Sequence, residues 1–521
     1  MKTIIWITII AAALSSAMFA ERLPEHKSGT IQVMKTLRGE DGGVDPYLLA
    51  YKRITRPSLP ESYDTPEGHF KIHYAVSGSD AVDSTGYVYN IGRYLERSWK
   101  AYMDTIGYLP PPPDGTEGGD AKYDVYLKNL SAYGITWPGP DGPQPWTDWT
   151  SYIEIENDFD GVYPNDDPEG PVAGAMKITC AHEFHHAVQY GLCGTSSAWI
   201  AEITSVSFEE RIYPMVNDYV WLIDYLSNDP HYPIDSDFGY HMYGLGLFGQ
   251  YLNMMFGDDF LFEVWDTMRF IDDWDALVAI SEKIGDGLGE IFSDFGAVAI
   301  FIGSRDCGIF PDGAALNDMS VENTHSSYPA DGSPVIEPYG YGLSYSIFSG
   351  FPTEDIDLNI TFHGEQTAGW FVKAVRREGD SLILFDVVSG DTSGSAVVPL
   401  VNDADYVAMV AVPAGATGER FDYEYSAIIE PSAVAERRLP GAARLNAYPN
   451  PFNSVCTFEM TGVETGEIEI FDISGRPIRQ IQLSIDGAAV WDGLDEAGEE
   501  LPSGTYLARA AGLVRAVTLI K

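Results

Sequence analysis

Positive charge is scarce in this sequence. Its 521 residues include 31 Lys and Arg against 77 Asp and Glu, which gives a formal net charge of −46. Such a surface repels phosphate backbones, so we expect no nucleic acid among its partners, and it disfavours anionic membranes for the same reason. The acidity instead suits solubility in an extracellular medium.

Cysteine is scarce as well. Only four cysteines are present, and no two of them form a Cys-x-x-Cys pair. A metal site built from cysteines is therefore disfavoured. Cys180 and Cys193 flank the end of a predicted helix, so a local disulfide and four free thiols are both open interpretations.

Long apolar runs are almost absent. The run at Ile4–Leu14 follows Lys2 and precedes small residues, as in a secretory signal, and it is short for a membrane span. We therefore expect residues 1–20 to be a signal peptide, with cleavage after Ala17 as a variant of this prediction. The mature protein should have no membrane span and be monomeric.

The pattern along the chain predicts several domains. Residues 21–66 are polar and are interpreted as a pro-segment or an extended arm. Residues 67–325 begin with strand-like segments and continue with helices, an order that suits an α+β catalytic domain. Residues 326–430 alternate between apolar and polar side chains, which predicts a β-sandwich. A linker over 431–444 then precedes a second β-rich domain over 445–521.

The segment His182-Glu183-Phe184-His185-His186 fits the pattern H-E-x-x-H within a helix predicted over residues 172–190. Residues four apart share one helix face, so both outer imidazoles can meet one ion. Zn²⁺ suits imidazole and carboxylate ligands and leaves one position open for water. Glu183 can reach that water without binding the metal, which predicts a catalytic base.

The third metal ligand decides the subclass of enzyme. A metzincin needs a histidine six residues after His186, where this chain has Leu192. The remaining solution is a carboxylate from the next helix, and Glu202 is the first choice, with Glu209 as the alternative. Glu209 also fits a different role, as a partner that orients a ligand histidine. We interpret His185, on another side of its helix, as a packing residue.

The reaction would also need a donor that stabilises an oxyanion. Tyr243, His241 and Tyr240 are candidates, although each also fits ordinary packing. By analogy with the order of elements in zincin folds, we expect the strand Tyr152–Glu156 to line the cleft and to pair with an extended peptide.

These segments resemble a known family. The helix motif from His182 to Gln189, the later Trp199-Ile200-Ala201-Glu202 and the downstream Tyr243-Gly244 are similar to secreted bacterial metalloproteases of the gluzincin-like kind, over about residues 68–430. The resemblance implies a zincin-like domain with His182, His186 and Glu202 as Zn²⁺ ligands and Glu183 as the base. Ile203-Thr204 depart from the family pattern, which has a small residue here, and we expect slight crowding.

The C-terminal domain carries its own ordered motifs. They resemble the type IX secretion sorting domain, an immunoglobulin-like unit, through Tyr448-Pro449-Asn450-Pro451-Phe452-Asn453, Ile473-Ser474-Gly475-Arg476, Trp491-Asp492-Gly493 and Ser503-Gly504-Thr505-Tyr506. The resemblance implies that the type IX secretion machinery exports the protein from a Gram-negative bacterium, to the medium or the cell surface.

Three functions fit these observations. The first is a zinc endopeptidase that acts on extracellular proteins or peptides. The second is a catalytically inactive surface adhesin or binding protein that kept the zincin fold. The third is a zinc hydrolase with a substrate other than a peptide. The first is favoured, because a binding module has no need of Glu183.

Overall fold

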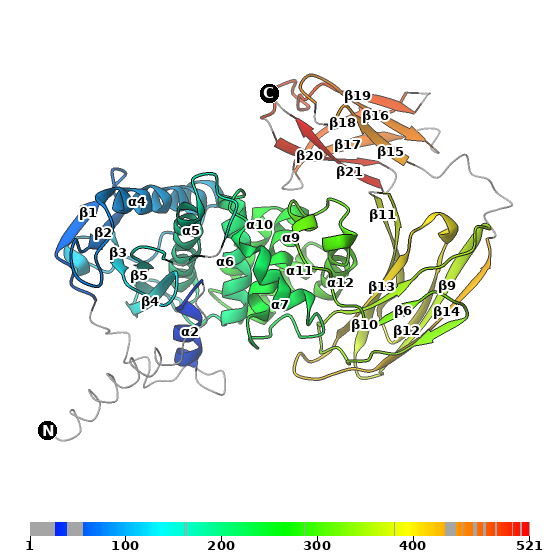
Figure 1. The fold of residues 1–521 in the computed structure, drawn as a ribbon, viewed down its shortest axis with the longest axis horizontal. Coiled ribbons are helices and arrows are strands. Elements are labelled where there is room, and N and C mark those ends of the chain that lie inside the picture. Colours follow the sequence, from blue (N-terminus) through cyan, green and yellow to red (C-terminus); the bar gives the residue numbers. More distant parts are fainter. Residues whose placement is uncertain are drawn as a thin grey trace. The chain divides into compact units, whose positions relative to one another are not determined.

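The protein is described by a computed structural model. It describes residues 27–38, 56–432 and 444–519, apart from residues 161, 163, 286, 380, 451, 462–465, 473–475, 485–486, 503 and 511–512. The predicted signal peptide and residues 433–443 of the predicted linker therefore lie outside the described residues. Figure 1 labels the helices and strands along the chain. By internal contacts the chain divides into two compact units, one of residues up to 221 with 261–277, the other of residues 222–260 with 278–519.

The first unit is built on one mixed sheet. Its five strands follow the order β1-β2-β3-β5-β4, with the bounds β1 (Glu61–Asp64), β2 (Phe70–Tyr74), β3 (Tyr123–Lys128), β5 (Trp149–Glu156) and β4 (Gly134–Asp141). The three inner strands are parallel, and both outer strands run antiparallel to their neighbours. β5 is thus hydrogen-bonded on both sides. The prediction that Tyr152–Glu156 pairs with a peptide is wrong, because β4 and not β5 forms this edge of the sheet.

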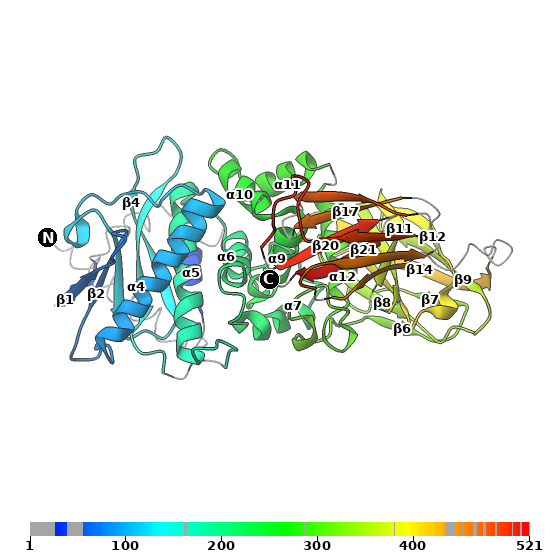
Figure 2. The ribbon, with the colours of Figure 1, turned by 90° about the horizontal axis from the view of Figure 1, so that it is seen from above.

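Helices pack on this sheet. α4 (Thr85–Trp99) and α5 (Pro171–Leu192) lie alongside one another (Figure 2). α5 also contacts β4, β5 and α6 (Ala198–Ile212). Proline occupies the first turn of α5, where its missing N–H costs nothing. Every residue of α5 from Gly174 to Leu192 is buried, as expected for a central helix that is covered on all sides.

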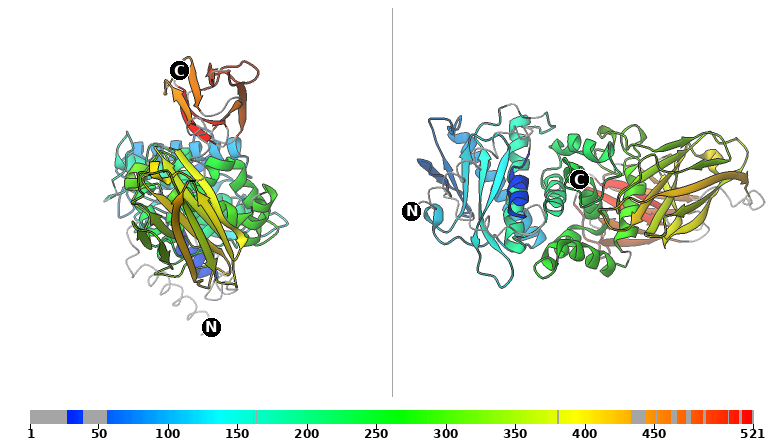
Figure 3. Two further views of the ribbon diagram at one scale, coloured as in Figure 1. Left: turned by 90° about the vertical axis from the view of Figure 1, so that its right-hand side faces the viewer. Right: turned by 90° about the horizontal axis from the view of Figure 1, so that it is seen from below.

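A short helix near the N-terminus belongs to the same unit. α2 (Thr30–Arg38) contacts β4 and α6 and is drawn in dark blue in Figure 3. Residues 27–38 and 56–66 are the described parts of the region that we interpreted as a pro-segment or an arm.

The remaining α-helices of the described residues follow α6 in the chain. Their bounds are α7 (Asp224–Ser227), α8 (His241–Gly244), α9 (Gly246–Phe256), α10 (Asp258–Thr267), α11 (Asp273–Lys283) and α12 (Leu288–Ala299). In the second unit, α12 packs on β10 and β13 of the sandwich. No helix among the described residues combines the length and the apolar character that a membrane crossing requires.

Two sheets of the second unit form the β-sandwich. Their orders are β11-β10-β13-β8-β6 and β12-β9-β14-β7. The bounds are β6 (Asn323–His325), β7 (Ala330–Gly332), β8 (Ser344–Phe348), β9 (Ile356–Gly364), β10 (Gly369–Glu378), β11 (Ser381–Asp391), β12 (Ser393–Val398), β13 (Val407–Ala414) and β14 (Tyr423–Pro431). Inward side chains of both sheets share one core, in which Trp370 is fully buried.

The C-terminal strands form two further sheets, β15-β16-β19 and β18-β17-β20-β21. The bounds are β15 (Arg444–Tyr448), β16 (Cys456–Thr461), β17 (Glu467–Asp472), β18 (Pro477–Gln482), β19 (Ala488–Trp491), β20 (Gly504–Ala510) and β21 (Leu513–Leu519). Their core surrounds Trp491. The prediction of an α+β region followed by β-rich regions is confirmed, whereas the finer zincin assignment and the domain boundaries stay predictions.

Candidate metal centre

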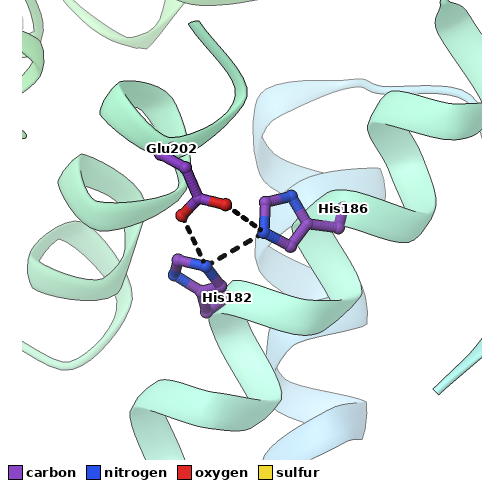
Figure 4. A group of neighbouring side chains, drawn as sticks. All are labelled: His182, His186 and Glu202. Carbon is purple, nitrogen blue, oxygen red and sulfur yellow. Dashed lines mark hydrogen bonds and ion pairs between the residues drawn. The ribbon is translucent and has the colours of Figure 1, made fainter. Parts of the chain in front are cut away.

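Three buried side chains converge between α5 and α6 (Figure 4). Nε2 of His182 and Nε2 of His186 are 3.0 Å apart. The two carboxylate oxygens of Glu202 lie 3.1 Å from these nitrogens, one from each. All three side chains are at most 3% exposed. The structure thus brings together the two histidines and the carboxylate that we selected as candidate ligands.

Helix geometry explains this convergence. The two histidines are one turn apart on α5, so their rings project from the same face. Glu202 lies on α6, which follows after a short connection and packs against α5. The expected crowding at Ile203-Thr204 does not keep Glu202 away. Ile203 is buried, and the Thr204 hydroxyl bonds to the carbonyl of Ile200 at 2.8 Å within the same helix.

The donor set fits zinc. Ligands held about 2.0–2.1 Å from a tetrahedral Zn²⁺ are about 3.3 Å from each other. The three atom pairs here, at 3.0, 3.1 and 3.1 Å, are close to that spacing. Within the described residues, neither oxygen of Glu202 receives a hydrogen bond, although the side chain is fully buried. A buried carboxylate without donors is costly unless a cation balances it.

The outer nitrogens of both imidazoles are fixed by hydrogen bonds. Nδ1 of His182 lies 2.6 Å from Oε1 of Glu209, and Nδ1 of His186 lies 2.7 Å from Oε1 of Gln189. Because a carboxylate can only accept, and because the Gln189 amide nitrogen donates to the carbonyl of Ala201, both Nδ1 atoms are the donors. Both Nε2 atoms therefore face the shared position, and in the neutral imidazoles these are the atoms that can ligate a metal.

Glu209 lies on the side of the His182 ring that faces away from the other two candidate ligands. It contacts the outer nitrogen and is not part of the three-residue group. Of the two roles that the sequence left open for Glu209, the geometry matches the one that orients a ligand histidine.

The electrostatics of the group favour a cation. Burial alone would lower the pKa of His182, but Glu202 and Glu209 outweigh it and raise the pKa to about 10. Burial alone would raise the pKa of Glu202, but His186 and His182 lower it to about 2. The position that these side chains face therefore attracts positive charge.

Glu183 lies outside the group of three and is held by two hydroxyls. The Thr30 hydroxyl donates to Oε2 of Glu183 at 2.8 Å, and the Thr136 hydroxyl donates to the same oxygen at 2.6 Å. β4 passes so close that a Cβ at Gly134 would stand 2.6 Å from Cγ of Glu183. Only glycine lets the strand approach the carboxylate in this way.

The other predicted residues lie elsewhere. His185 is fully buried, and Nδ1 lies 2.9 Å from the Ser205 hydroxyl, which matches the packing role that we expected. His241 and Tyr243 lie on α8, and Tyr240 directly precedes it, all in the second unit. Their proposed part in stabilising an oxyanion is therefore untested.

Sequence reasoning missed three residues around this group. Gln189 follows His186 by three positions, a helical spacing that could have revealed its contact. Thr136 and Thr30 reach Glu183 from β4 and α2, and no spacing along the chain signals these contacts. All four cysteines are free thiols, so the alternative of a bridge between Cys180 and Cys193 is not realised.

The known proteins compared with this chain each match only part of it. A stretch of 162 residues is 25% identical to Laccase-1 of Emericella nidulans and covers 28% of this chain and 26% of the laccase. The chain thus spans about a quarter of that relative's length.

Similar solved structures include Tripeptidyl Peptidase 2, with 8% identity, 39% of this chain and 24% of that chain covered, and a TM-score of 0.18. The BSP domain of a biofilm associated protein is 10% identical, with 37% of this chain and 48% of that chain covered and a TM-score of 0.13. The β-1,2-glucanase from Parabacteroides distasonis is 12% identical, with 37% of this chain and 33% of that chain covered and a TM-score of 0.14. At these TM-scores the likeness carries no argument about fold or function.

The C-terminal region gives the clear match. Residues 446–516 match the family described as secretion system C-terminal sorting domain, which confirms the resemblance of the tail. The matched region covers the strands that surround Trp491. The chain therefore ends in a type IX secretion sorting domain, and the protein is secreted or held at the cell surface of a Gram-negative bacterium.

Proposed function

We propose that this protein is a secreted zinc-dependent metalloendopeptidase with a zincin-like catalytic domain. The observation that carries the proposal is the convergence of His182, His186 and Glu202, with Nε2 of both histidines and a carboxylate facing one position. Glu183, one residue after the first histidine, supplies the carboxylate that a hydrolase needs and a binding site does not.

The chemistry divides between the ion and the chain. When bound, Zn²⁺ would polarise the scissile carbonyl and lower the pKa of water to ~7. His182, His186 and Glu202 would hold the ion, while Glu209 and Gln189 keep the imidazoles oriented. Glu183 takes a proton from the attacking water and passes it to the nitrogen of the leaving amine.

Metal content separates this proposal from an inactive adhesin. Protein collected after export is expected to contain one zinc per chain and to cleave casein, and a chelator is expected to stop the cleavage. A protein without metal would favour the binding protein. Zinc without cleavage of any peptide would favour a hydrolase that acts on another class of substrate.

Replacing Glu183 tests the assigned base. We expect Glu183→Ala to keep its zinc, because Glu183 is not in the ligand group, and to lose about 10²–10⁴-fold in kcat. Glu210→Gln is the matched control, since Glu210 is a half-buried carboxylate of α6 outside the group. Casein cleavage retained by Glu183→Ala would contradict the proposed mechanism.

A further inference from the structure

Residues 27–29 extend the sheet of the first unit at its β4 edge. The carbonyl of Lys27 accepts hydrogen bonds from the amides of Tyr133 and Gly134, at 2.9 and 3.3 Å. The amide of Gly29 donates to the carbonyl of Gly134 at 2.8 Å, and Ser28 forms a parallel bridge with the same residue. Residues 27–29 thus occupy the start of the β4 edge beside Gly134, on the side of the sheet where a peptide strand could otherwise pair.

The next residue, Thr30, covers the carboxylate of Glu183, the proposed catalytic base. The hydroxyl of Thr30 donates to Glu183 and accepts from the amide of Thr136 at 2.8 Å. Thr30 is fully buried and Glu183 is 1% exposed. A carboxylate that must take a proton from water and deliver it to a leaving group needs room for both, and here Thr30 fills that space.

The side chain of Lys27 anchors the segment. Its ammonium group pairs with Glu209 and lies 3.4 Å from Asp218, and the side chain is only 4% exposed. Burial lowers the pKa of Lys27, but the two carboxylates outweigh it, so the pKa is raised and the ammonium stays charged. The pocket beside His182 is therefore built for a basic side chain.

We propose that the groove along β4 is the substrate-binding site, with Glu209 and Asp218 as a pocket for a lysine or arginine side chain, and that residues 27–30 fill it and lower the activity of the enzyme without abolishing it. The inference rests on the proposed function. It also gives residues 27–30, within the region that we interpreted as a pro-segment or an arm, an inhibitory role, whereas β1 remains part of the sheet.

Gly29 offers a way to displace the segment. A Cβ at this position would stand 2.6 Å from Cγ1 of Ile135, so Gly29→Val should destabilise the docked segment. An overpacked contact costs about 1–3 kcal/mol, so the groove should open roughly 5- to 150-fold more often. Gly418→Val is the matched control, because a Cβ there meets nothing within 4 Å.

The first measurement is kcat/KM on quenched fluorescent peptides with one central Lys or one central Glu. In the full exported chain, Gly29→Val is expected to cleave the Lys peptide roughly 5- to 150-fold faster than the wild type or Gly418→Val, and faster than it cleaves the Glu peptide. Thr30→Val, which replaces the hydroxyl by a methyl group, should show a smaller gain and serves if Gly29→Val fails to fold. Equal rates for all variants with zinc bound would overturn the inference while leaving the peptidase intact.

The second measurement is independent of catalysis. A labelled, acetylated peptide of residues 27–36 is expected to bind the double variant Gly29→Val, Glu183→Gln. It is not expected to bind Glu183→Gln alone, in which the chain's own residues 27–30 stay docked. The same peptide with Lys27→Ala should bind about tenfold more weakly, as loss of a charge-assisted contact implies. If the peptide binds selectively but no variant cleaves any substrate, the result would support the proposed binding groove and refute the proposed peptidase activity. Absence of binding to Gly29→Val would overturn the inference.

Discussion

Replacing Glu209 by glutamine tests how the candidate metal centre is held. The two oxygens of Glu209 serve different partners, Nδ1 of His182 at 2.6 Å and the ammonium of Lys27. Glutamine has one oxygen and one NH₂ group, so it can accept from only one of them. The charged ammonium takes the oxygen, and the NH₂ group then faces Nδ1. His182 must shift its proton to Nε2, the atom that should bind the metal.

The expected loss follows from that change of tautomer. Removing a partner that orients a metal-binding histidine weakens metal affinity about 10- to 100-fold, which corresponds to about 1.4–2.8 kcal/mol. The measurement is zinc competition with a chromophoric chelator at fixed pH, with Glu210→Gln as the control. If Glu209→Gln binds zinc as tightly as wild type and control, the geometry behind His182 has no role in metal binding.

Two further predictions concern stability. Trp491→Ala in the sorting domain should cost about 3–5 kcal/mol, because the indole is fully buried against Phe452 and Tyr506; urea unfolding checks it, and Val490→Ala, at a position 55% exposed, should change little. Burial raises the pKa of Glu156 from 4.5 to about 7, so within this window the folded state holds a proton that the unfolded state has lost, and stability falls as pH rises. Glu156→Gln should flatten this fall in thermal unfolding between pH 5 and 8; an unchanged slope would assign the effect to other groups.

Much of the fold could be predicted from the spacing of residues within single helices and strands. The separation of His182 and His186 depends only on helix geometry, and the sequence places both on one face of α5 without knowledge of the rest of the chain. Alternation of apolar residues likewise marks β9, whose Leu358, Ile360 and Phe362 enter the sandwich core. These features need no information about how elements meet.

Features that depend on packing between elements were harder to predict. Glu202 and Glu209 lie on one face of α6, and only the position of this helix on α5 decides which carboxylate reaches Nε2 and which reaches Nδ1 of His182. The strand at the sheet edge was also misassigned, because β4 follows β3 in the chain but pairs outside β5. Lys27 meets Glu209 across 182 residues of sequence, a separation at which no local pattern exists.

The amide of Gln189 has a consequence for how the centre behaves as a whole. Its oxygen holds His186, and its nitrogen bonds to the carbonyl of Ala201, the residue directly before Glu202. The planar amide of Gln189 therefore joins α5 to α6. It bonds to one proposed ligand, His186, and to the residue next to another, Glu202. Any sliding of one helix along the other would turn the His186 ring and shift Glu202 together, so the centre should assemble and come apart as a unit and not ligand by ligand.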